Sequence, residues 1–201
     1  MSFNQIEYEK YERERTIGIL SDMLENETGK ALLDAGCGNG RLMCVWQNHA
    51  DKVYGVDIDT ENLEKAKWCG METTKADMRS LPFGNSAFDI VVSVSCFMCF
   101  KELKSVLIEL RRVCGRIAII SFPTSDYCKL WGKPTSNGSY THDFAETMKQ
   151  IKTAGFVVNQ IRAYQYVPPR YATILGYLDE IGKTLPSFGR VVFVKCTPQK
   201  W

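Results

Sequence analysis

The stretch that most constrains the fold is a run of three glycines directly after a short apolar segment. Residues 32–40 read Leu-Leu-Asp-Ala-Gly-Cys-Gly-Asn-Gly, and Leu42, Val45, Trp46 and His49 follow at helical spacing. This order predicts a buried strand, a tight turn and the start of a helix. Glycine suits such a turn because it tolerates positive φ and lets the backbone approach a ligand closely. The helix start adds N–H groups that attract a carboxylate or phosphate.

The spacing of these glycines distinguishes between nucleotide-binding motifs. A dinucleotide site has the pattern G-x-G-x-x-G, whereas this turn has G-x-G-x-G, and a P-loop needs a Lys where Arg41 stands. The stretch closely resembles the first motif of class I S-adenosylmethionine-dependent methyltransferases. The resemblance implies a set of cofactor-binding residues at this turn: Asp34, Gly36, Cys37 and Gly38. The alternative is a structural turn in some other α/β protein.

A second strand, residues 52–57, ends in an acid. Asp57 stands seventeen residues after Gly40, a separation that suits one helix and a return strand. An acid at the end of the second strand of a βαβ unit can accept both ribose hydroxyls of a nucleoside. Ile58 would then lie against the adenine ring. The alternative role for Asp57 is a helix cap, but Asp59 and Thr60 are better placed for that.

Two later segments extend the resemblance. Residues 72–76 predict a short third strand that leads into Asp77-Met78, and in the resembled family this dipeptide position holds the adenine. Residues 81–89, Leu-Pro-Phe-Gly-Asn-Ser-Ala-Phe-Asp, resemble the loop before the fourth strand of many small-molecule methyltransferases. That strand, residues 90–95, ends at Ser95 and Cys96, where the resemblance places the transferable methyl group. The implied cofactor is S-adenosylmethionine, with S-adenosylhomocysteine as the product.

The resemblance runs from about residue 28 to the end of the chain and implies a fold. We expect an α/β, Rossmann-like class I methyltransferase fold: a seven-stranded, mostly parallel sheet of order 3-2-1-4-5-7-6, strand 7 antiparallel, with helices on both faces. Residues 1–201 form one domain in this interpretation, with a helical cap at 1–27. Irregular, aromatic inserts at 123–141 and 164–189 form the acceptor pocket, or their aromatics are ordinary core packing.

Composition narrows the cellular setting and the partners. The net charge is +2 and basic residues cluster at most in pairs, which argues against extended nucleic-acid binding. There is no apolar run of membrane-span length, and the polar N-terminus differs from a signal peptide. We therefore expect a cytoplasmic protein without membrane contact, whose eight cysteines are free thiols. A homodimer is left open.

The acceptor is the least constrained part of the function. A sulfonium methyl needs little activation, so orientation supplies much of the rate and no catalytic residue is assigned. Because no Asn-Pro-Pro-Tyr or Asp-Pro-Pro-Tyr follows the fourth strand, we favour a small-molecule acceptor. One alternative is arsenite methylation by Cys96 and neighbouring thiols, although Cys96 and Cys99 are more simply buried inert thiols, and no metal site is assigned. Another is a cofactor-binding scaffold without turnover.

Overall fold

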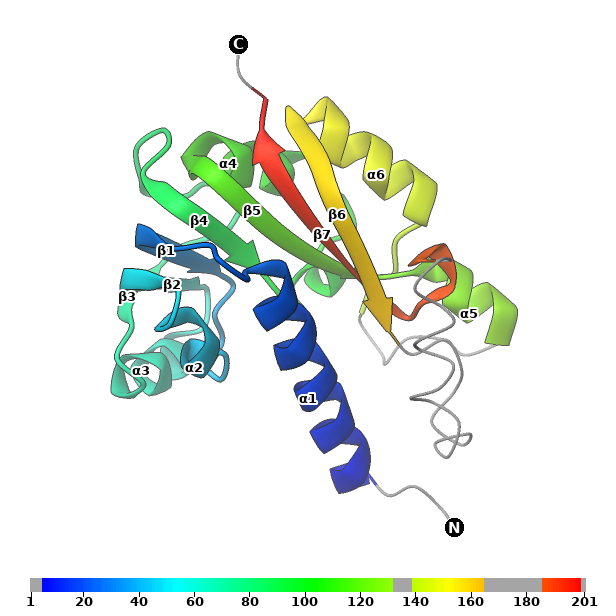
Figure 1. Ribbon diagram of the computed structural model, residues 1–201, viewed down its shortest axis with the longest axis horizontal. Coiled ribbons are helices and arrows are strands. Elements are labelled where there is room, and N and C mark those ends of the chain that lie inside the picture. The colour runs from blue at the N-terminus through cyan, green and yellow to red at the C-terminus, as the bar shows by residue number, and fades with distance from the viewer. Residues whose placement is uncertain (1–4, 132–138, 165–185, 200–201) are drawn as a thin grey trace.

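The computed structural model describes residues 5–131, 139–164 and 186–199, which form a seven-stranded sheet with helices on both faces (Figure 1). The strand order is β3-β2-β1-β4-β5-β7-β6, and β7 runs antiparallel to β5 and β6. The predicted topology is therefore confirmed. The strands are β1 (Gly29–Ala35), β2 (Ala50–Asp57), β3 (Glu72–Lys75), β4 (Phe88–Ser93), β5 (Cys114–Pro123), β6 (Phe156–Tyr164) and β7 (Val191–Pro198).

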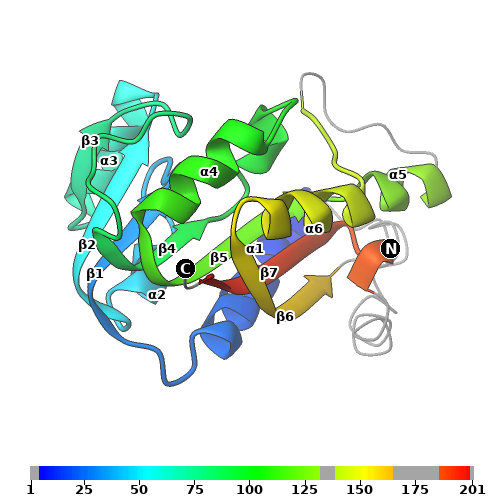
Figure 2. The ribbon, with the colours of Figure 1, turned by 90° about the horizontal axis from the view of Figure 1, so that it is seen from above.

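The described helices divide between the two faces of the sheet. Apolar side chains of α4 and α6 pack with the sheet in one core cluster, and those of α1, α2 and α3 pack with it in another. Figure 2 shows α4 and α6 on the opposite face of the sheet from α1. The helices are α1 (Gln5–Met23), α2 (Met43–Trp46), α3 (Thr60–Trp68), α4 (Lys104–Val113), α5 (Ser125–Trp131) and α6 (Phe144–Thr153), with 3₁₀ turns η1 (Phe97–Cys99) and η3 (Pro186–Phe188). None of the described helices has the length and apolarity needed to cross a membrane.

Local sequence explains how these elements begin and which side they bury. Four apolar positions of α4 recur at helical spacing and are buried, namely Val106, Leu107, Leu110 and Val113, whereas Ile108 is exposed. The Asp59 carboxylate accepts the N–H of Glu61 at 2.8 Å and caps α3, as its sequence position predicts. Central strands such as β4 read as apolar runs because helices cover both of their faces.

Two segments differ from the sequence-based prediction. The helix expected through His49 is only the single turn α2, because the chain has to reverse into β2, which begins at Ala50. The His49 carbonyl accepts the N–H of Gly29 at 2.9 Å beside the sheet. Part of the stretch expected to be irregular, residues 123–140, forms α5 instead. Thr124 Oγ1 accepts the N–H of Tyr127 at 3.4 Å there, a helix-start contact that the sequence reading overlooked. Much of both predicted inserts, residues 132–138 and 165–185, lies outside the described residues.

Candidate functional site

The ends of β1, β2 and β3 are bonded into a row at one edge of the sheet. The N–H groups of Gly36 and Cys37 donate to the Val56 carbonyl at 2.7 and 3.0 Å, and the Ala76 N–H donates to the Asp57 carbonyl at 3.1 Å. On the other side of β1, the end of β4 leads to Cys96. The strand order reverses between β1 and β4, and ligands of open α/β sheets bind in the crevice at such a switch point.

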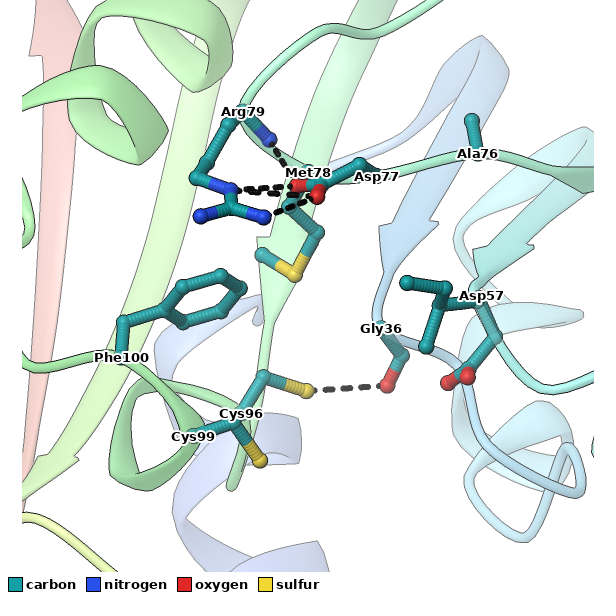
Figure 3. Close-up of a pocket in the computed structure, with 10 residues that line it drawn as sticks. Gly36, Asp57, Ala76, Asp77, Met78, Arg79, Cys96, Cys99 and Phe100 are labelled. Atoms are coloured by element: carbon teal, nitrogen blue, oxygen red, sulfur yellow. Dashed lines mark hydrogen bonds and ion pairs between the residues drawn. The ribbon is translucent and has the colours of Figure 1, made fainter.

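A cavity of about 290 Å³ opens at this edge (Figure 3). It brings together six of the predicted site residues: Gly36, Asp57, Ile58, Asp77, Met78 and Cys96. Four further residues complete its lining, namely Ala76, Arg79, Cys99 and Phe100. The predicted residues Asp34, Cys37, Gly38 and Ser95 do not line this cavity. Residues from four strand ends that are distant in sequence thus share one concave site.

The glycine turn leaves room for the wall contributed by Cys96. Gly36 has φ of 80°, and a Cβ atom added there would lie 2.2 Å from the Cys96 sulfur. The Cys96 thiol donates to the carbonyl oxygens of Gly36 at 3.0 Å and Val94 at 3.2 Å. Only glycine therefore fits at position 36 without displacing the residue that joins β4 to the turn.

Asp57 is held by backbone donors but keeps free acceptor capacity. Its Oδ2 accepts the N–H of Gly38 at 2.9 Å, and its Oδ1 accepts the N–H of Asp59 at 2.9 Å. Each carboxylate oxygen has two lone pairs, so each can accept one more hydrogen bond. The neighbouring Ile58 side chain also lines the cavity and is 66% exposed. An oriented carboxylate thus stands beside uncovered apolar surface.

Asp77 carries a partner that the sequence analysis did not identify. The Arg79 side chain donates from Nε to both carboxylate oxygens, at 3.0 and 3.1 Å, and from Nη2 to Oδ2 at 2.6 Å. The Arg79 backbone N–H also donates to Oδ1, at 2.8 Å. These bonds hold the pKa of Asp77 below its ordinary value. An Arg two residues after a turn aspartate is the only sequence signal for this pair.

The predicted residues outside the cavity lining support it from within. Asp34 is buried beneath the turn and accepts the Trp46 Nε1–H at 2.7 Å, and burial raises its pKa to about 7. Burial likewise raises the pKa of Cys37, to about 12. Ser95 has φ of 61°, and its N–H donates to Ser121 Oγ at 2.9 Å. These contacts fix the strand ends that bear the lining residues.

The thiols beside the cavity differ in exposure. Burial raises the pKa of Cys96, so this thiol stays protonated and acts as a hydrogen-bond donor, whereas Cys99 is exposed. Within the part of the chain that the structure describes, no group of three or more His, Cys, Asp or Glu side chains is arranged to hold a metal ion. The geometry therefore gives the metalloid interpretation no support.

The cavity wall at η1 is braced by residues from far along the chain. The buried His142 ring contacts the Phe97 carbonyl through Nε2 at 2.9 Å, and the Tyr140 N–H donates to the Met98 carbonyl at 2.8 Å. His142 is itself anchored at the end of β5, because its N–H donates to the Pro123 carbonyl at 2.9 Å. The turn that carries Cys96 and Cys99 is thereby tied to the start of α6.

Comparison with known proteins agrees with this arrangement. Residues 33–120, which include all the described residues that line the cavity, match the family model described as a methyltransferase domain. The fold of this chain is also that of solved methyltransferases. Among these, magnesium protoporphyrin IX methyltransferase from Synechocystis PCC 6803 with bound S-adenosylhomocysteine superposes on this chain with a TM-score of 0.72, 18% identity, and coverage of 99% of this chain and 90% of that one. An S-adenosylmethionine-dependent methyltransferase from Mesorhizobium loti superposes with a TM-score of 0.66 and 17% identity, and the alignment covers 90% of this chain and 96% of that one.

Two curated relatives match this chain over about half of its length. The malonyl-[acyl-carrier protein] O-methyltransferase of Hamiltonella defensa is 33% identical over 95 residues, which cover 46% of this chain and 37% of that protein. The bifunctional methionine biosynthesis protein MetXA/MetW of Rhodopirellula baltica is 32% identical over 113 residues, 51% of this chain and 18% of that protein. The chain thus spans well under two thirds of the length of both relatives.

Proposed function

We propose that this protein is an S-adenosylmethionine-dependent methyltransferase. The observation that carries the proposal is Asp57, a carboxylate oriented by the N–H groups of Gly38 and Asp59, with one acceptor site left on each oxygen. Two adjacent hydroxyls of a ribose match two adjacent acceptors. The exposed Ile58 side chain beside it offers apolar surface that a purine ring would cover.

The other cavity residues fit the remaining parts of the same cofactor. Asp77 stands at the end of the neighbouring strand, where a carboxylate would accept the adenine amine. Met78, buried in the cavity wall, would contact the ring. Gly36 lacks the side chain that would block the path from the ribose toward Cys96. Asp34, Cys37, Gly38 and Ser95 would act by shaping the turn and the end of β4.

The bound cofactor supplies an electrophilic methyl group on a sulfonium. The contribution of this chain is to hold the nucleoside, to orient the cofactor and to place the acceptor in line with it, since orientation alone can supply much of the rate. Cys96 forms part of the wall at the end of β4 and is proposed to lie on the methyl side. No residue is assigned as a general base.

The proposed acceptor is a small molecule. Relatives and structural neighbours are named for malonyl-[acyl-carrier protein], demethylmenaquinone and magnesium protoporphyrin IX, none of which is a nucleic acid. The net charge of the chain is only +2, and its adjacent basic residues come at most in pairs such as Arg111-Arg112, which gives no extended basic segment for a phosphate backbone. The two inserts, residues 123–141 and 164–189, remain the proposed acceptor pocket.

Calorimetric titration of the purified chain tests the cofactor class. S-adenosylmethionine and S-adenosylhomocysteine should each bind saturably, whereas NAD should give only dilution heats. Titrations that are flat for both cofactor forms, with protein that unfolds cooperatively on heating, would refute the proposal. Release of S-adenosylhomocysteine in the presence of fractionated metabolites then identifies the acceptor.

A further inference from the structure

The side chain of Arg79 leaves the proposed adenine acceptor with no spare capacity. An ionised carboxylate has about four lone-pair sites. On Asp77, Oδ1 accepts the Arg79 N–H and Nε–H, while Oδ2 accepts Nη2–H and shares Nε–H (Figure 3). Asp57 differs, because each of its oxygens has a single backbone donor. Of the two carboxylates that the described residues bring to the cavity, Asp57 is open to a ligand and Asp77 is occupied by this protein's own side chain.

The donors of Arg79 have the same character as those of an adenine amine. Both present N–H groups, and both need the lone pairs of Asp77 that face the cavity lined by Arg79 and Phe100. The backbone N–H of Arg79 holds Oδ1 independently of the guanidinium, at 2.8 Å. The carboxylate can therefore keep its orientation while the guanidinium group leaves.

We propose that the guanidinium of Arg79 competes with the adenine amine for the Asp77 carboxylate, and that Arg79 thereby sets the affinity for the cofactor. This inference rests on the proposed function. The Arg79 side chain is 59% exposed and that of Asp77 is 30% exposed, so the guanidinium can exchange this partner for water. Binding of the adenine then includes the loss of an ion pair between partly exposed groups, which is a small but measurable cost.

The test compares the affinity for S-adenosylhomocysteine of the parent, Arg79→Ala and Lys101→Ala. This ligand lacks the sulfonium charge, so a general change in the electrostatic potential affects it little. Arg79→Ala should bind roughly two- to fivefold more tightly, the range that corresponds to an exposed ion pair. Lys101 is exposed, lies directly after Phe100 and does not line this cavity, so Lys101→Ala controls for the lost positive charge and should leave the affinity unchanged.

A double-mutant cycle shows whether the effect passes through Asp77. In an Asp77→Ala background, Arg79→Ala should no longer tighten binding, because the contested carboxylate is gone. Unchanged or weaker binding by Arg79→Ala alone, or equal tightening in the Asp77→Ala background, would overturn the competition. Those results would not contradict the proposal that this protein binds S-adenosylmethionine. Absence of S-adenosylhomocysteine binding by both folded parent and Arg79→Ala would instead refute the proposed function and this inference with it.

Discussion

Replacing Asp57 by Ala should separate cofactor binding from folding. The substitution removes an ionised acceptor for the proposed ribose hydroxyls, and hydrogen bonds to charged groups contribute about 1.5–3 kcal/mol. At about 1.4 kcal/mol per factor of ten, the Kd for S-adenosylhomocysteine should rise roughly ten- to 150-fold. The backbone N–H groups of Gly38 and Asp59 lose their acceptor as well, but both residues are at least partly exposed, so these N–H groups can donate to water instead. The free energy of unfolding should therefore fall by only about 1 kcal/mol.

Asp59→Ala is the matched control for this experiment. Asp59 lies two residues away and caps α3 through the Glu61 N–H at 2.8 Å, so its loss should lower the free energy of unfolding by about 1 kcal/mol. The affinity should stay at the parent value, because Asp59 does not line the cavity. Calorimetry gives the Kd and denaturant unfolding gives the stability. Parent-like affinity in Asp57→Ala, or an equal loss in Asp59→Ala, would show that the ribose assignment is wrong.

Four further substitutions test separate parts of the site. Gly36→Ala places a Cβ 2.2 Å from the Cys96 sulfur at φ of 80°, so it should lower the melting temperature and abolish cofactor binding, and parent-like values would contradict the close fit. Burial raises the pKa of Asp34 to about 7 from an ordinary 3.8, so its contribution to stability is complete at low pH and is lost as the pH rises toward 7. In the parent, the free energy of unfolding measured with denaturant should fall over this pH range by on the order of 4 kcal/mol at most, and in Asp34→Asn it should not. The same pH profile in the parent and in Asp34→Asn would contradict the raised pKa. Cys96→Ser and Cys99→Ser should both retain cofactor binding, and neither they nor the parent should methylate arsenite; arsenite methylation by the parent that is lost in Cys96→Ser would restore the metalloid interpretation.

The positions of the residues at strand ends were predictable because they depend on the order of strands along the chain. Once the glycine turn and Asp57 after an apolar run imply parallel strands, Gly36 and Asp57 must meet at the same sheet edge, and the family resemblance added Asp77 after the short polar strand β3. The capping role of Asp59 likewise follows from its place directly before a helical stretch. For such residues, position in the sequence decides position in the fold.

Side-chain directions and short elements were not predictable in the same way. Nothing in the residue pattern states that the Arg79 guanidinium turns back to Asp77, or that Asp34 points inward to the Trp46 indole. The length of α2 is limited by the start of β2 at Ala50, next to His49, whose carbonyl accepts the N–H of Gly29 twenty positions earlier. Contacts between distant parts of the chain decide these features, and they cannot be predicted from the local pattern of apolar residues.

The bracing of η1 has a consequence for where a minimal cofactor-binding unit would end. Among the described residues, those that line the cavity fall between positions 36 and 100, inside the segment 33–120 that matches the methyltransferase domain model. A fragment cut to those limits would keep the lining but lose the Tyr140 and His142 contacts to the carbonyls of Met98 and Phe97. The η1 part of the cavity wall would then lose the hydrogen bonds that hold it in place. Tyr140 and His142 thus support the cofactor pocket, although neither of them lines the cavity that the cofactor is proposed to fill.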